Sequence, residues 1–136
     1  MPLREIDTNP REIESNPATD ADAKVMLRAT ITLFAKWGIT DEDAAILLDL
    51  PVRTYRRWKA GQPGRMGRDT MARMSNLLGI HSALRSVFAD PQRGYDWIRA
   101  ENAAFGEMSA LETMLGGELT DLMRVRRYLD AEQDGW

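Results

Sequence analysis

The chain contains no cysteine and only one histidine, His81, among its 136 residues. Without cysteine it can form neither a disulfide nor a thiolate metal site, and one histidine without a second nitrogen or sulfur ligand is a poor metal ligand. No apolar run approaches the roughly 18–20 residues of a membrane-spanning helix, and the first residues lack the apolar core of a secretion signal. We therefore expect a cytoplasmic protein with no metal, no cofactor and no membrane partner.

Arrangements of polar residues that are typical of catalysis are missing as well. Ser82, beside His81, lacks the sharp turn that presents a nucleophilic serine. Paired carboxylates such as Asp41 and Asp43 are more simply explained as helix-end charges than as general acids. We expect no catalytic residues and predict that the protein is not an enzyme.

No segment alternates apolar and polar residues with the period of a strand, and apolar residues recur instead at helical spacing. We therefore predict an all-α fold. The predicted organisation is a mobile arm over residues 1–20, a helix-turn-helix domain over 21–66, and a small helical domain with a C-terminal tail over 67–136.

The first predicted helix begins after an N-cap at Thr19 or Asp20 and stops at Gly38, which suits a left-handed helix end. Its predicted apolar positions are Val25, Leu27, Ile31, Phe34 and Ala35. The next helix has Thr40 as its cap, three acidic residues in its first turn, and an end near Asp49. A third helix begins at Pro51 or Val52, which predicts a helix, a three-residue turn and a second helix.

Positive charge is concentrated in this part of an otherwise acidic chain. The formal net charge is -3, yet the stretch from Pro51 to Ser75 holds seven Lys or Arg residues against one Asp. At about 100° per residue, the arginines at 53, 56 and 57 share one face of the third helix, while Tyr55 and Trp58 lie on the other. We predict that the aromatic residues pack inward against Ala44, Leu48 and Leu50, and that the basic face points outward.

The stretch "LDLPVRTYRRWKAG" (Leu48–Gly61) resembles helix-turn-helix regulators of the Xre type, with Asp49 at the turn position usually occupied by glycine. Aspartate tolerates the left-handed conformation better than most residues. We predict a DNA-recognition helix, together with a Gly-rich loop that lies along phosphates. The predicted DNA contacts are Arg53, Thr54, Arg56, Arg57, Lys59 and Arg65. The alternatives are that the arginines form a solvated face of a structural helix or pair with Asp41, Glu42 and Asp43, and that the loop is a plain flexible connector.

The second half is predicted to be helical over 68–80, 81–90 and 91–102, with a break at Asp90-Pro91 and with His81 next to a helix start. A turn at Phe105-Gly106, a helix capped by Ser109 and Glu112, a stop at Gly116-Gly117 and a long last helix follow. Trp37, Trp58, Trp97 and Leu129 lie at periodic positions and are predicted to belong to the core.

This half resembles the toxin-binding domain of Xre/MbcA/ParS-type antitoxins through the order and spacing of short motifs rather than through any one of them. The motifs are Val87-Phe88, Asp90-Pro91, Trp97-Ile98, Glu101-Asn102, Phe105-Gly106, Ser109 to Leu111, Leu115, Gly117, Leu129 and Gly135. Ala110 replaces the family's usual proline, and Ala131-Glu132 stands where an Arg-Ile pair is common.

The resemblance implies an antitoxin that blocks the active site of a cognate RES-like, NAD-consuming toxin and represses its own operon. The partners implied are this toxin, operator DNA and a second copy of the chain in a homodimer. The last segment would approach the toxin's catalytic cleft through Arg126, Arg127, Asp130, Glu132, Asp134 and Trp136. The alternative function is a free-standing helix-turn-helix repressor whose helical C-domain only dimerises.

Overall fold

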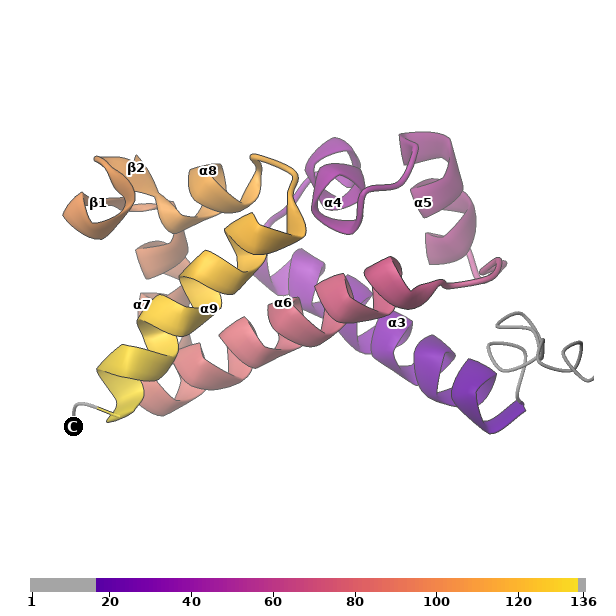
Figure 1. The fold of residues 1–136 in the computed structure, drawn as a ribbon, viewed down its shortest axis with the longest axis horizontal. Helices are drawn as coiled ribbons and strands as arrows, with labels where there is room; N and C mark the ends of the chain where they lie inside the picture. The colour runs from indigo at the N-terminus through magenta and orange to yellow at the C-terminus, as the bar shows by residue number, and fades with distance from the viewer. Residues whose placement is uncertain (1–16, 135–136) are drawn as a thin grey trace, which may run out of the picture.

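The computed structural model describes residues 17–134, which form helices joined by short turns and one small hairpin (Figure 1). The elements are α3 (Pro17–Trp37), α4 (Asp41–Leu48), α5 (Val52–Lys59), α6 (Arg68–Val87), α7 (Pro91–Arg99), β1 (Glu101–Asn102), the 3₁₀ turn η1 (Ala103–Phe105), β2 (Met108–Ser109), α8 (Ala110–Met114) and α9 (Leu119–Asp134). The all-α prediction is confirmed, and the two-residue antiparallel pair β1–β2 is the one departure among these elements. None of the described helices is both long enough and apolar enough to cross a membrane.

Helix α3 begins at Pro17, earlier than the cap pattern indicated, and ends as predicted before Gly38, whose φ is +69°. The rest of the predicted arm, residues 1–16, lies outside the described residues. The predicted apolar face of α3 was partly wrong, since Val25 is 55% exposed and Ala35 is also exposed. The buried face carries Ala23, Leu27, Thr30, Leu33, Phe34 and Trp37. Apolar type alone did not identify this face, because it includes a threonine whose hydroxyl donates to the carbonyl of Met26 at 2.8 Å.

The prediction of a helix start beside His81 was wrong, because α6 continues unbroken from Arg68 to Val87. Gly79, in its middle, gives close access to α9 instead of ending the helix. A Cβ at Gly79 would lie 2.5 Å from Cζ of Arg126, whose guanidinium packs over this position. Gly79 therefore makes room for the packing of α9 against α6. The local sequence does not distinguish such a glycine from one that ends a helix.

Helix α6 is the central element of the fold. It crosses α3 on one side and lies along α9 on the other (Figure 1). Its buried apolar side chains belong to the one core cluster that contains most of the described buried hydrophobic residues; they are Met74, Leu77, Ile80, Ala83 and Leu84. Trp37, Trp58 and Leu129 are buried in this core as predicted, whereas Trp97 packs against it only half-buried.

Two arginines join the N-terminal helices to the C-terminal ones. Arg73 on α6 is only 4% exposed, and its Nη1 donates to the carbonyl oxygens of Leu47 at 3.3 Å and Gly117 at 2.9 Å. Its Nε donates to Asp69 at 2.8 Å. Arg99 on α7 donates from Nη2 to the carbonyls of Trp37 and Gly38, at 2.7 and 2.9 Å. A buried charge is tolerated only when it is paired and hydrogen-bonded, and Arg73 meets both conditions.

We expect Arg73→Met to lower the free energy of unfolding by about 2–4 kcal/mol, because the Leu47 and Gly117 carbonyls lose a buried donor. Urea unfolding followed by circular dichroism measures this. The matched control is Asp69→Asn, which weakens an ion pair whose carboxylate is 56% exposed and should cost less than about 1 kcal/mol. Equal losses in the two variants would show that the contacts to the carbonyls contribute nothing.

Candidate functional site

Helices α4 and α5 form the predicted helix-turn-helix. The hydroxyl of Thr40 caps α4 by accepting from the backbone N–H of Asp43 at 3.1 Å. The helix ends at Asp49, which adopts the left-handed conformation with φ of 56°, so the aspartate does replace the usual glycine. Pro51 occupies the N-cap position of α5 without a side-chain capping hydrogen bond, and the connection is three residues long as predicted.

The aromatic side of α5 packs inward. Tyr55 and Trp58 are buried with Ala44 and Leu48, and the Tyr55 ring meets Phe34 edge to face with centroids 6.1 Å apart. Burial, and to a lesser extent the charge of Asp41, raises the pKa of Tyr55 to about 12. The hydroxyl therefore stays protonated at ordinary pH, and α5 is held in place by apolar contact.

The outward side of α5 is basic, but part of its charge is already paired. Arg53, Arg56, Arg57 and Lys59 are exposed and Thr54 is half-buried. Arg56 donates to Asp41 at 3.2 Å and to Glu42 at 2.7 Å, which confirms for this residue the predicted alternative of pairing with the acids of α4.

The remaining basic residues differ in their surroundings. Lys59 Nζ donates to the other oxygen of Asp41 at 2.9 Å. Arg53 and Arg57 have no ion pair within the described part of the chain. Arg65 lies in the exposed loop between α5 and α6. The six residues predicted to contact DNA thus lie on α5 and on the loop after it. Among them, Arg56 and Lys59 form ion pairs with acids of α4, whereas Arg53 and Arg57 form none within the described part of the chain.

The ion pairs between α4 and α5 shift the pKa values of Asp41 and Arg56. The hydrogen bond from Lys59, with a further one from Arg56, lowers the pKa of Asp41 despite some burial. The contact with Asp41 in turn raises the pKa of Arg56. Both groups are therefore charged at neutral pH, and the acidic first turn of α4 neutralises part of the basic face of α5.

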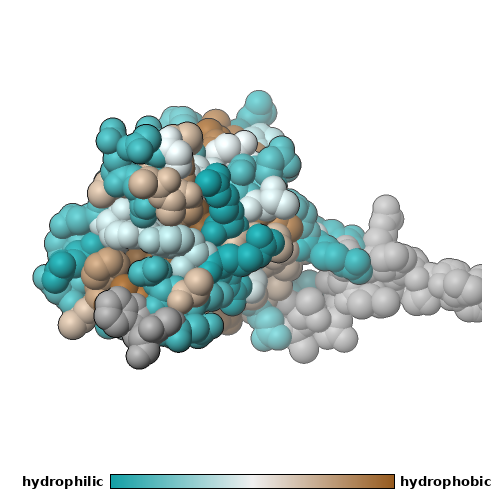
Figure 2. All heavy atoms as spheres, turned by 60° about the vertical axis from the view of Figure 1, so that its left-hand side comes forward, coloured by the Kyte–Doolittle hydropathy of each residue, from teal (hydrophilic) through white to brown (hydrophobic). Residues whose placement is uncertain are grey.

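The predicted toxin contacts lie on α9, apart from Trp136, which is outside the described residues. The exposed members are Arg127, Asp130, Glu132 and Asp134. Arg126 differs from them, because it lies over Gly79, reaches the Ser75 carbonyl at 3.5 Å and sits 3.9 Å from Asp130. Figure 2 shows the side of the molecule on which α9 ends: hydrophilic side chains cover most of it, and apolar ones gather in small separate areas.

An aromatic cluster beside α9 was not predicted as a feature of the surface. The Trp97 and Tyr128 rings stack with centroids 6.0 Å apart, and Phe105 meets Tyr128 edge to face at 5.3 Å. The guanidinium of Arg124 lies 5.4 Å from the Phe105 ring centre and donates to the Ala104 carbonyl at 3.1 Å. These residues come from α7, η1 and α9, so no local pattern in the sequence reveals that they meet.

Comparison with known proteins identifies both halves. Residues 17–79 match the antitoxin Xre-like helix-turn-helix domain, and residues 83–135 match the antitoxin Xre/MbcA/ParS C-terminal toxin-binding domain. The two matches meet within α6. Together they span nearly the whole described chain, so the protein belongs to the Xre/MbcA/ParS family of antitoxins, and the resemblance predicted from its motifs is confirmed.

Two further proteins are similar over most of the chain. An uncharacterized protein of Sinorhizobium fredii, y4oB, is 40% identical over 123 residues, which are 89% of this chain and 95% of that protein. A chain in the crystal structure of the M. tuberculosis MbcT–MbcA toxin–antitoxin complex shares the fold, with a TM-score of 0.57 and 19% identity. That likeness covers 83% of this chain and 95% of the other.

The acid dependence of stability tests the ion pairs at Asp41. Because pairing lowers the pKa of Asp41 in the folded protein, its stabilisation is complete above the ordinary pKa of 3.8 and is lost as the pH falls through the lowered value. We expect Asp41→Asn to be less stable than the unmodified protein at pH 6, and the difference to shrink toward pH 2. Urea unfolding across this range measures it, and Asp22→Asn on α3 is the control. A difference that is constant with pH would contradict the pairing.

Proposed function

We propose that this protein neutralises a cognate toxin through its C-terminal helices and represses its own operon through α5. The observation that carries the proposal is the presence of two antitoxin domains in one chain, built around the shared helix α6. The toxin is proposed to be a RES-like enzyme that consumes NAD, and inhibition to act by covering its active site. The MbcT–MbcA complex, in which a toxin and an antitoxin are bound to each other, supports direct binding as the mode of neutralisation.

The DNA contact is proposed to centre on Arg53 and Arg57. These two side chains point outward from α5 and have no ion pair in the described structure, so their charge is available for guanine edges or phosphates. Arg56 and Lys59 share their charge with Asp41 and Glu42 and would contribute less. Thr54 and Arg65 are proposed to contact phosphates. Two copies of α5 in a homodimer would read half-sites about one turn of duplex, roughly 34 Å, apart.

We expect the double substitution Arg53→Ala/Arg57→Ala to weaken binding to DNA from upstream of the gene and to reduce the slope of log K against log salt by about 2. A fluorescence titration over a salt series measures both quantities. The matched control, Arg85→Ala/Arg93→Ala, removes the same charge from the C-terminal half. If the control loses as much affinity, the effect is one of net charge and the assignment to α5 is wrong.

The toxin contact is proposed to use the exposed side chains near the end of α9: Arg127, Asp130, Glu132 and Asp134, with Arg126 beside them and Trp136 beyond the described residues. Carboxylates there would face cationic groups in the toxin's NAD pocket. Deletion of α9 would not test this, because its Leu122, Val125 and Leu129 are fully buried in the core. Substitution of exposed residues keeps the fold and changes only the surface.

We expect Asp130→Lys/Asp134→Lys to weaken toxin binding about tenfold or more, equivalent to roughly 1.4 kcal/mol. Cellular NAD is measured after induction of the neighbouring toxin gene, with and without each antitoxin variant. The control is Asp20→Lys/Asp22→Lys on α3, at the opposite end of the molecule from the end of α9 (Figure 1). NAD should collapse without antitoxin, recover with the control, and recover poorly with the α9 variant.

Other outcomes separate the two functions. If induction stops growth while NAD stays constant, the toxin has another chemistry and the antitoxin role remains. If induction changes neither growth nor NAD, toxin neutralisation is not supported, and a repressor whose C-terminal half serves dimerisation becomes the better interpretation.

A further inference from the structure

The first residues of the chain contain a tandem heptapeptide repeat. Arg-Glu-Ile-Asp-Thr-Asn-Pro at 4–10 is followed directly by Arg-Glu-Ile-Glu-Ser-Asn-Pro at 11–17. Five of the seven positions are identical, and the other two exchange Asp for Glu and Thr for Ser. Each copy presents one isoleucine, Ile6 or Ile13, between two carboxylates. The second copy ends at Pro17, the first residue of α3.

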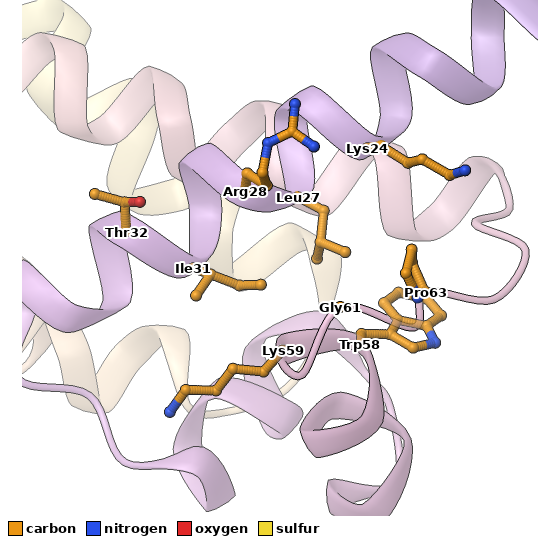
Figure 3. A pocket seen from close by; sticks show the side chains of 9 residues that line it. All are labelled: Lys24, Leu27, Arg28, Ile31, Thr32, Trp58, Lys59, Gly61 and Pro63. Carbon is orange, nitrogen blue, oxygen red and sulfur yellow. The ribbon is translucent and has the colours of Figure 1, made fainter.

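Two adjoining hollows lie between α3 and the segment that follows α5. The first, of about 390 Å³, has an apolar lining that includes Leu27, Ile31 and Trp58, with Lys24, Arg28 and Lys59 also around it. Figure 3 shows that α3 and the end of α5 supply these side chains from opposite sides. The second, of about 350 Å³, shares Lys24 and Pro63 with the first and also contains Asp20, Ala23, Gly64, Arg65 and Met66.

The two hollows together form a groove, and several charged or polar groups around this groove have no partner in the described structure. Lys24 and Arg28 have no ion pair within residues 17–134. The Trp58 residue is 4% exposed, and its buried Nε1–H finds no acceptor in the described structure. This nitrogen lies 3.4 Å from where a Cβ on Gly64 would stand, so the donor sits where the two hollows adjoin. A buried donor without an acceptor is costly, and a backbone carbonyl placed there would satisfy it.

The repeat matches this groove in chemistry and in reach. An isoleucine flanked by carboxylates suits an apolar floor with cations around it. From Pro17 an extended chain reaches about 14 Å to Ile13 and about 37 Å to Ile6. At 1.5 Å per residue, Lys24 lies about 10 Å and Ile31 about 21 Å along α3 from the same point. Each repeat can therefore reach one hollow.

We propose that residues 4–14 fold back along α3 and dock in this groove, with Ile6 in the hollow formed by Leu27, Ile31 and Trp58, and Ile13 in the adjoining one. The carboxylates beside the isoleucines then face Lys24, Arg28 and Lys59. A docked arm also brings negative charge to the C-terminal end of α5, beside a surface proposed to meet DNA. The docking itself depends on neither the DNA nor the toxin proposal.

The test uses the full chain with a nitroxide label on Asn9→Cys, which is a unique thiol because the protein has no cysteine. We expect paramagnetic broadening to remove at least about half the intensity of the amide signals of α3 between Lys24 and Ile31 and of the Trp58 indole signal. Signals of α8 and α9 should keep their intensity. The broadening should disappear in Ile6→Ser/Ile13→Ser, persist in the matched control Thr8→Ala/Ser15→Ala, and weaken at high salt.

A charge exchange tests the same contact from the other side. Lys24→Glu/Arg28→Glu changes two exposed residues and should abolish the broadening, and adding Glu5→Lys/Glu12→Lys should restore it. Broadening spread evenly over the protein, or unchanged by the isoleucine substitutions, would overturn the proposal. A second sample mixes ¹⁵N chains that carry no nitroxide with spin-labelled ¹⁴N chains. Broadening of the same α3 signals in this sample would also overturn the proposal, because the docked arm would then belong to a second copy.

Discussion

The buried guanidinium of Arg73 is the interaction on which the arrangement of the two halves depends. One side chain on α6 donates to a carbonyl at the end of α4 and to another in the turn before α9. The Arg73 side chain is buried and the Leu47 carbonyl is bonded in the interior, while the Gly117 carbonyl is half-buried, so this one guanidinium links both segments to α6. Arg99 repeats this contact at the end of α3. The basic helix α5 and the C-terminal surface are therefore carried by one rigid framework.

The electrostatics of the helix-turn-helix follow from this placement. The first turn of α4 is acidic because carboxylates favour a helix N-terminus, and the fold sets it beside α5. Asp41 then holds both Arg56 and Lys59, while Arg53 and Arg57 stay unpaired in the described structure. The basic face that looks uniform in the sequence is thus divided into a neutralised part and a part available to a polyanion. Such self-pairing lowers the positive potential of α5 and leaves Arg53 and Arg57 as its unpaired cations in the described structure.

Much of the fold could be predicted because its signals are local. The cap at Thr40, the left-handed Asp49 and the capping box of Ser109 and Glu112 each involve residues a few positions apart. The predictions that were wrong concern contacts between segments that are distant in the sequence. The predicted helix start beside His81 was wrong because Gly79 serves the packing of Arg126 of α9 against α6, and the exposure of Val25 depends on which side of α3 faces α6.

In the candidate site, too, local features could be predicted from the sequence and contacts between distant segments could not. Periodicity correctly placed the basic residues on the outer face of α5, but the partners of Arg56 and the stacking of Trp97 on Tyr128 required the tertiary structure. Which exposed side chains make contacts with other molecules is not encoded in helical periodicity. The sequence patterns therefore predict where charge gathers more reliably than what it contacts.

The uninterrupted course of α6 has a consequence for how such proteins diversify. The two family domains meet within this one helix, whose buried residues contribute to a single core. Recombination that joins one protein's helix-turn-helix half to another protein's C-terminal half must cut inside α6 and keep its helical phase, because a shift of one residue rotates the downstream face by about 100°. Change in the two halves is therefore more accessible through substitutions on the exposed surfaces of α5 and α9 than through exchange of halves.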